Sequence, residues 1–108
     1  MASRPRHDGR QPREEAERLP AEAHLIRGWS EHPFGMLQEL DASFDAVAMV
    51  GWHGTATHPG NPLTHTLTGT YAKVTLNGES CSEYLLHAHI AAPTGTPAVF
   101  LSGDTGIC

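Results

Sequence analysis

The chain has 108 residues, a length that fits one domain at most. Hydrophobic residues make up 39% of it and charged residues 18%, which is typical of a globular protein. Its formal net charge of −5, its one lysine, Lys73, and the confinement of its arginines to positions up to Arg27 argue against nucleic-acid binding, which needs clustered basic side chains.

Localisation and redox setting follow from other absences in the sequence. No apolar run is long enough to span a bilayer, and the N-terminus has no apolar segment of the kind found in secretory signals. Cys81 and Cys108 form neither a disulfide framework nor a Cys-x-x-Cys pair. We therefore expect a cytoplasmic protein with no membrane partner.

The composition of the chain changes near residue 20. Residues 1–20 contain almost no large apolar side chains and are rich in Arg, Pro, Gly and Glu. Such a segment cannot bury enough surface to offset its conformational entropy. We expect residues 1–20 to be a disordered N-terminal segment and residues 21–108 to be the folded part.

The first expected elements are a short strand over residues 24–27 and a helix over residues 33–40. Pro33 stands at a favourable first helical position, and apolar residues follow it at helical spacing. The apolar run over residues 44–52 then predicts a strand that is buried on both faces, as in a parallel sheet.

The second half of the chain predicts a hairpin, a helix and a strand. Asn77-Gly78 lies between alternating segments and is a strong signal for a tight β-hairpin. Ser82 is a suitable N-cap for a helix that stops before Pro93, and an apolar run leads to Asp104. This order predicts an α/β fold with a mainly parallel sheet, a β-hairpin and flanking helices.

Three histidines, His53, His58 and His65, follow the strand that ends near residue 50. Ligands of open α/β sheets bind at the carboxyl ends of the strands, which favours His53 as a site residue. Gly and Pro residues give the intervening loop a defined path back to His65. Solvent-exposed polar loop residues are the alternative, and we prefer that interpretation for His58.

Glu83 would begin the helix after the hairpin, where an acidic side chain is favourable through the helix dipole alone. His87 and His89 lie two residues apart on this helix and point to different sides, so they cannot readily share a metal ion. We interpret both as helix-surface or packing residues.

Two stretches, DAVAMVGWHGTATHPGNPLTHTL and VTLNGESCSEYLLHAHIAAPTGTPAVFLSGD, resemble the D-aminopeptidase family of zinc metallopeptidases, of the type found with dipeptide-transport operons. The resemblance covers about residues 22–106. Four motifs occur in the family's order: Gly-Trp-His at 51–53, Thr-His-Thr at 64–66, Asn-Gly-Glu-Ser-Cys-Ser-Glu at 77–83 and Ser-Gly-Asp at 102–104.

The resemblance implies a role for three residues. His53 and Glu83 match zinc ligands of the family, and His65 matches its catalytic histidine. The implied reaction releases an N-terminal residue, often a D-amino acid, from a short peptide substrate. The resemblance also implies that full-length relatives are homo-oligomers.

Parts of the family pattern have no counterpart in this chain. The family begins with a strand that carries an Asp-x-Glu metal pair, takes a further histidine ligand from an Asp-Ser-His segment, and continues into a large C-terminal portion. We therefore expect an internal fragment of a larger three-layer domain. A catalytic zinc site normally has three protein ligands, so two assigned ligands predict weak zinc binding and an inactive isolated chain.

Two alternatives remain open. The chain could be a non-catalytic metal-binding or interaction module that kept part of the fold. It could also be a piece that needs a complementary chain to supply the remaining ligands.

Overall fold

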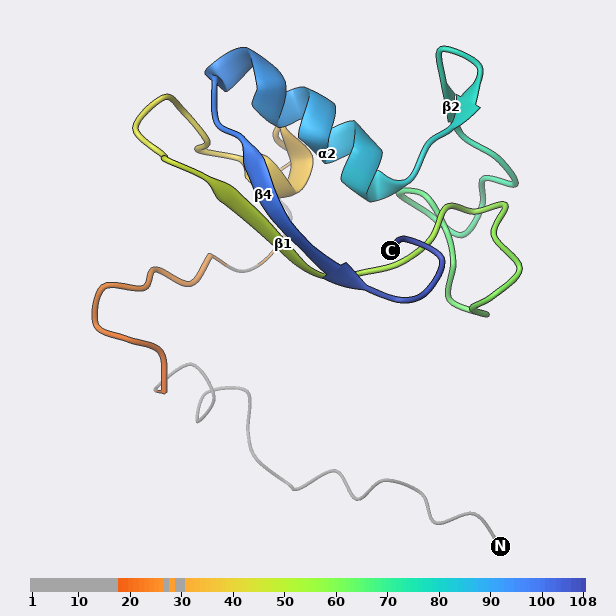
Figure 1. Cartoon of the computed structure of the whole chain (residues 1–108), viewed down its shortest axis with the longest axis horizontal. Helices are drawn as coiled ribbons and strands as arrows, with labels where there is room; N and C mark the ends of the chain where they lie inside the picture. The colour runs from red at the N-terminus through yellow and green to blue at the C-terminus, as the bar shows by residue number, and fades with distance from the viewer. Residues whose placement is uncertain (1–17, 27, 29–30) are drawn as a thin grey trace, which may run out of the picture.

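The computed structural model describes residues 18–26, 28 and 31–108 of the chain (Figure 1). Two strands of similar length pair in parallel, a helix lies along them, and a short hairpin precedes that helix. In chain order the elements are η1 (Gly35–Leu37), β1 (Val47–Trp52), β2 (Thr75–Leu76), β3 (Glu79–Ser80), α2 (Glu83–Ala91), η2 (Ala92–Thr94) and β4 (Ala98–Gly103). The expected α/β class, with a parallel pair and a hairpin, is confirmed.

The parallel pair β1–β4 is the frame of the molecule. A parallel connection requires a crossover, and the chain makes it through the hairpin and α2 before returning as β4. The core lies between this pair and α2. It comprises the buried residues Leu40, Val47, Met49 and Ala91, with Leu37, Trp52, Tyr84, Ala98 and Leu101 packed partly buried against them.

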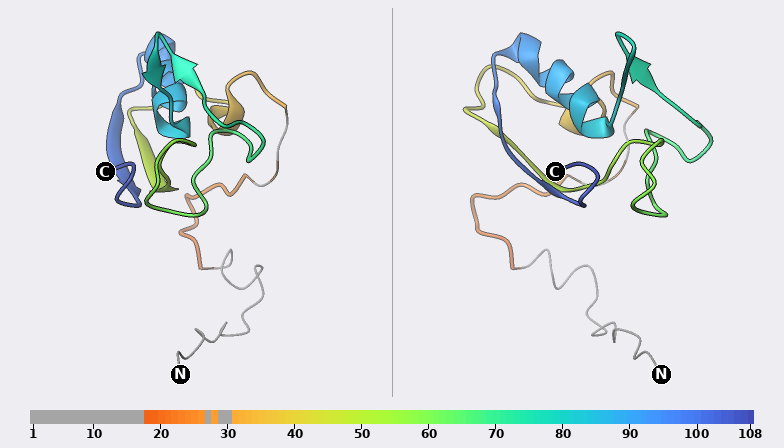
Figure 2. Two further views of the ribbon diagram at one scale, coloured as in Figure 1. Left: turned by 90° about the vertical axis from the view of Figure 1, so that its right-hand side faces the viewer. Right: turned by 45° about the vertical axis from the view of Figure 1, so that its right-hand side comes forward.

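The second face of the β1–β4 pair is open. Helix α2 lies on one side of the strands (Figures 1 and 2). On the other side Val50, Val99 and Phe100 are 71%, 63% and 54% exposed. The prediction that residues 44–52 are buried on both faces is therefore wrong, because no element of the described residues covers this face. We call Val50, Val99 and Phe100 the open face.

Local signals in the second half of the chain are confirmed. Asn77 and Gly78 both have positive φ, 53° and 90°, as a two-residue hairpin turn requires. The Ser82 hydroxyl accepts a hydrogen bond from the Leu85 N–H at 3.1 Å and so caps α2. The apolar run before Asp104 forms β4.

The predictions for residues 24–40 are wrong in the described part. Residues 24–26 form no strand, and Arg27 lies outside the described residues. The expected helix over residues 33–40 is reduced to η1, because Gly35 and Glu39 both have positive φ (55° and 69°), which an α-helix cannot accommodate.

The expectation for residues 1–20 falls mostly on residues 1–17, which lie outside the described part. Residues 18–20 are exposed. None of the helices in the described part has the length and apolar character needed to cross a membrane.

Candidate metal centre

His53 follows the last residue of β1 and lies at the carboxyl end of the parallel pair. Its Nδ1 is 3.1 Å from the Gly54 carbonyl oxygen. A carbonyl can only accept, so Nδ1 carries the proton and donates it. The other ring nitrogen, Nε2, is left with its lone pair free, which is the arrangement that prepares a histidine for a metal ion.

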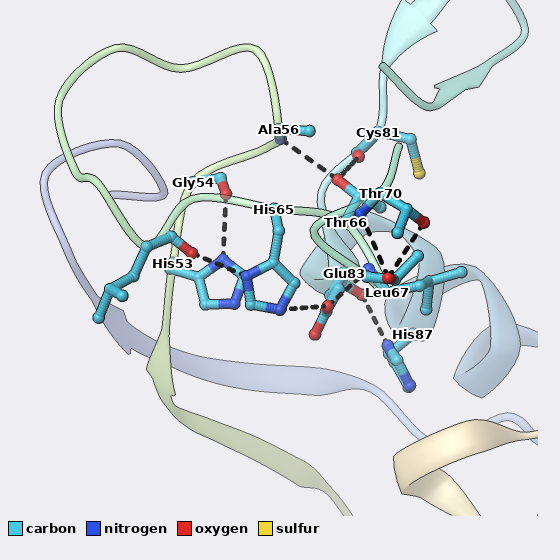
Figure 3. Close-up of polar contacts among 12 residues, drawn as sticks. His53, Gly54, Ala56, His65, Thr66, Leu67, Thr70, Cys81, Glu83 and His87 are labelled. Carbon is cyan, nitrogen blue, oxygen red and sulfur yellow. Dashed lines mark hydrogen bonds and ion pairs between the residues drawn. The ribbon is translucent and has the colours of Figure 1, made fainter. Parts of the chain in front are cut away.

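His65 reaches the same place from the far side of the loop. Its Nδ1 donates to the Leu63 carbonyl at 2.7 Å, so its Nε2 is also free of a proton when the ring is neutral. The rings of His53 and His65 lie 4.2 Å apart between centroids, tilted by 36° (Figure 3). The His65 Nε2 lies 3.6 Å from Glu83 Oε1.

Glu83 is the first residue of α2 and is only 8% exposed. Its Oε1 accepts a hydrogen bond from the Leu67 N–H at 2.7 Å. Leu67 also has a φ of 64°, which is an uncommon conformation for a residue other than glycine. The helix-dipole account of Glu83 is therefore incomplete, since its side chain also binds the loop that carries His65.

Thr66 joins the loop to the segment before α2. Its side chain is fully buried, and its hydroxyl donates to the Cys81 carbonyl at 2.8 Å and accepts from the Ala56 N–H at 3.4 Å. Cys81 is a buried free cysteine, and burial raises the pKa of its thiol. Sequence reasoning gave Thr66 no role, although its place beside His65 in the Thr-His-Thr motif was a signal.

The three residues singled out from the sequence thus converge. One candidate ligand atom from each of His53, His65 and Glu83 lies within 4.8 Å of the other two, and Figure 3 shows the side chains facing one another. Two imidazoles and a carboxylate are a donor set found in catalytic zinc sites. The donor set and the free Nε2 atoms fit a divalent metal ion. We call these three residues the His/Glu cluster.

His87, the buried histidine of α2, is fully engaged elsewhere. It donates from Nδ1 to the Glu83 carbonyl at 2.7 Å and accepts at Nε2 from the Met36 N–H at 3.2 Å. Both ring nitrogens are therefore committed to the backbone, and His87 is a packing residue, as one of the two sequence interpretations had it.

His58 and His89 also lie outside the cluster. His58 accepts from the Gly60 N–H at 3.1 Å and helps to shape the loop. His89 is exposed, and its Nδ1 donates to the Leu85 carbonyl at 2.9 Å. Their local contacts agree with the loop and helix-surface roles expected from the sequence.

A cavity of about 260 Å³ opens beside the His/Glu cluster. Apart from the three cluster residues it is lined by Met36, Val50, Gly51, Trp52 and Leu67. The cluster therefore faces an open space with a mainly apolar wall, as expected for a small-molecule site.

The structure thus defines an α/β protein with a candidate metal-binding group at the carboxyl end of its parallel strands. Comparison with known proteins identifies the family: the model of the D-aminopeptidase family matches residues 15–108, and the chain belongs to that family. The resemblance seen in the sequence is thereby confirmed.

One curated relative is the D-aminopeptidase of Bacillus subtilis (strain 168), which is 31% identical over 88 residues. The aligned part covers 82% of this chain and 31% of the relative. The chain thus spans about a third of the length of the curated relative that it matches. No solved structure matches the chain significantly.

Proposed function

We propose that the His/Glu cluster belongs to the active centre of a metal-dependent aminopeptidase that releases N-terminal amino acids, D-amino acids among them, from short peptides in the cytoplasm. Membership of the D-aminopeptidase family supports the reaction class. The observation that carries the proposal is the convergence of three ligand-capable side chains, with candidate ligand atoms within 4.8 Å of one another, at the end of β1.

His53 and Glu83 are the proposed ligands of a zinc ion. His53 presents Nε2 because its Nδ1 is committed to the Gly54 carbonyl. Glu83 keeps one oxygen committed to the Leu67 N–H, which fixes the carboxylate beside the two rings. When bound, the ion would polarise the scissile carbonyl and acidify a water molecule.

His65 is the proposed catalytic residue. Its ring is held through Nδ1 by the Leu63 carbonyl, and its side chain is 37% exposed and lines the cavity beside the cluster. A histidine in this position takes up or gives a proton at Nε2 during attack on the peptide carbonyl. Because Nε2 also lies near Glu83, a role as a third ligand is the competing assignment, and the two assignments predict different mutant behaviour.

The 108-residue chain is proposed to bind zinc weakly and to be inactive by itself, because only two of its residues match family ligands. The open face argues against the alternative that the chain is an independent binding module, and it favours an arrangement in which further polypeptide covers the sheet. An uncovered apolar side of a parallel pair is expected where further chain packs, whether in a longer polypeptide, a homo-oligomer or a complementary chain.

Zinc titration by calorimetry on four variants tests this proposal. We expect His53→Ala and Glu83→Ala to abolish the weak binding of the wild-type chain, and His65→Ala to retain most of it. His89→Ala is the matched control, because His89 is an exposed histidine of α2 outside the cluster. In a full-length relative, the equivalent of His65→Ala should lower turnover by about 10²–10⁴-fold, as general acid–base roles do.

Unchanged zinc binding in His53→Ala would contradict the proposed centre. Equal loss of metal in His53→Ala, Glu83→Ala and His65→Ala would make His65 a ligand and remove its separate catalytic role. Metal-dependent turnover by the 108-residue chain alone would refute the inactive state while leaving the site assignment intact.

A further inference from the structure

The Ser-Gly-Asp motif at the end of β4 contributes no ligand to the His/Glu cluster, yet its aspartate contacts both neighbours of His53. The Asp104 N–H donates to the Trp52 carbonyl at 3.0 Å. The Asp104 Oδ1 accepts from the Gly54 N–H at 3.1 Å. The backbone on each side of His53 is therefore hydrogen-bonded to the same residue.

The second carboxylate oxygen of Asp104 leads toward His65. Oδ2 accepts from the Asn61 side-chain amide at 2.8 Å, and the Asn61 Oδ1 accepts from the Leu63 N–H at 2.9 Å. The Leu63 carbonyl in turn accepts from His65 Nδ1 at 2.7 Å. A continuous series of hydrogen bonds thus runs from Asp104 to the second histidine ring.

Gly103 permits this arrangement. A Cβ at position 103 would overlap the Trp52 carbonyl oxygen, far inside contact distance. Only glycine lets β4 pass close enough to β1 for the next residue to reach the Trp52 carbonyl. The motif therefore has a packing residue, Gly103, followed directly by the hydrogen-bonding residue.

The Asp104 carboxylate is also kept charged. Its hydrogen bond from the Asn61 side chain, followed by those from the backbone N–H groups of Gly54, Gly106 and Ile107, lowers the pKa of Asp104. Hydrogen bonds to an ionised acceptor are stronger than those between neutral groups, so this carboxylate holds the loop more firmly than a neutral side chain would.

We infer that Asp104 is a positioning residue that fixes His53 through Trp52 and Gly54 and orients His65 through Asn61 and Leu63. This role rests on the proposed metal centre, because the two rings that it holds in place are those proposed to bind the metal ion and to act on the substrate. Asp104 itself donates no atom to the His/Glu cluster of the described residues.

Cobalt(II) titration of the full chain, followed by visible absorption, tests the inference, because the absorption bands report both affinity and ligand geometry. We expect Asp104→Asn to weaken Co²⁺ binding by about 10–100-fold, the usual cost of losing a group that orients a metal ligand. Asp41→Asn is the matched control. Its carboxylate likewise accepts hydrogen bonds, but from Ser43 in its own turn, and its loss should leave Co²⁺ binding unchanged.

A reciprocal exchange separates positioning from simple loss of a residue. In the double variant Asp104→Asn with Asn61→Asp, the amide and carboxylate trade places and the hydrogen bond between them is restored in the opposite direction. The side-chain oxygen of the amide introduced at position 104 can still accept from the Gly54 N–H. We expect the exchange to recover most of the lost affinity and the wild-type band positions.

Circular dichroism first shows which variants are folded, and only folded variants are compared. If Asp104→Asn does not fold, Asn61→Ala, which removes the side chain that links Asp104 to Leu63, carries the test and should weaken Co²⁺ binding to a smaller extent. Wild-type affinity and bands in the folded variants would overturn the positioning role. Failure of His53→Ala to change Co²⁺ binding would instead overturn the proposed metal centre on which that role rests.

Discussion

The loop that runs from His53 to His65 and the open face of the β1–β4 pair are neighbouring regions of the molecule. They differ in whether their side chains have partners within the described residues. In the loop, polar groups find partners within the chain: Thr66 with Cys81, Asp104 with Asn61 and Gly54, Glu83 with Leu67. On the open face, Val50, Val99 and Phe100 are more than half exposed. Polar side chains of the described residues thus pair with one another around the site, whereas the same residues leave one face of the sheet uncovered.

Consecutive residues of β1 give the largest expected contrast between the covered and the open side. Met49 is 2% exposed and Val50 is 71% exposed. Met49→Ala should destabilise the fold by about 2–5 kcal/mol, because it leaves a cavity in the core. Val50→Ala should stay within about 0.5 kcal/mol, as is usual for surface positions. Urea denaturation of both variants measures the difference.

A large cost of Val50→Ala would break this comparison, because it would mean that the open face is buried in solution. In that case the cost should depend on protein concentration, and sedimentation should show association.

Substitution of Gly103 tests the close contact between the end of β4 and Trp52, where the sheet meets the loop. Gly103→Ala places a Cβ against the Trp52 oxygen and 2.5 Å from the Ile107 Cγ2, so we expect a loss of about 1–3 kcal/mol from overpacking, or more if the backbone cannot move. Gly69→Ala is the matched control, because nothing lies within 4 Å of its added Cβ. Equal stability of the two variants in urea would show that β4 can move away from Trp52 without cost.

The smallest expected effect is a dependence of stability on acid pH. The pKa of Asp104 is lowered in the fold, first by its hydrogen bond from Asn61. Its contribution is therefore present above the unfolded value of about 3.9 and is lost as the pH falls through the lower folded value. When urea midpoints are measured from neutral pH downward, the midpoint concentration should decrease once the pH is below about 4. The decrease should be less steep in Asp104→Asn than in the wild type.

Asp41 provides the control for this pH dependence, since hydrogen bonds from Ser43 lower its pKa as well. Asp41→Asn should remove its own part of the acid dependence and leave the part due to Asp104. An Asp104→Asn profile with the wild-type slope would contradict the assignment.

The parts of the fold that local chemistry determines could be predicted from the sequence. Asn77-Gly78 forms the turn, Ser82 caps α2, and the two apolar runs form β1 and β4. The convergence of His53 and His65 also followed, because a loop that starts at a strand end and returns brings its two ends together.

The remaining features depend on contacts between distant residues. Gly35 approaches His87 so closely that an added Cβ would lie 2.8 Å from its Nε2, and no local pattern reveals a contact between η1 and a helix so far along the chain. The contact with His87 occurs in η1, the short element found where a longer helix was expected. The role of Asp104 likewise depends on the parallel register that sets Gly103 opposite Trp52.

That register also has a consequence for the order in which the chain can fold. The Asp104 carboxylate and the Gly54 N–H that it binds are separated by 50 residues, so their contact requires closure of a long loop. Loop closure of this kind is entropically unfavourable until non-local contacts form, and β1–β4 pairing supplies them. We therefore expect the Asp104–Gly54 hydrogen bond, and with it the final backbone orientation of His53, to form together with the β1–β4 pairing and not before it.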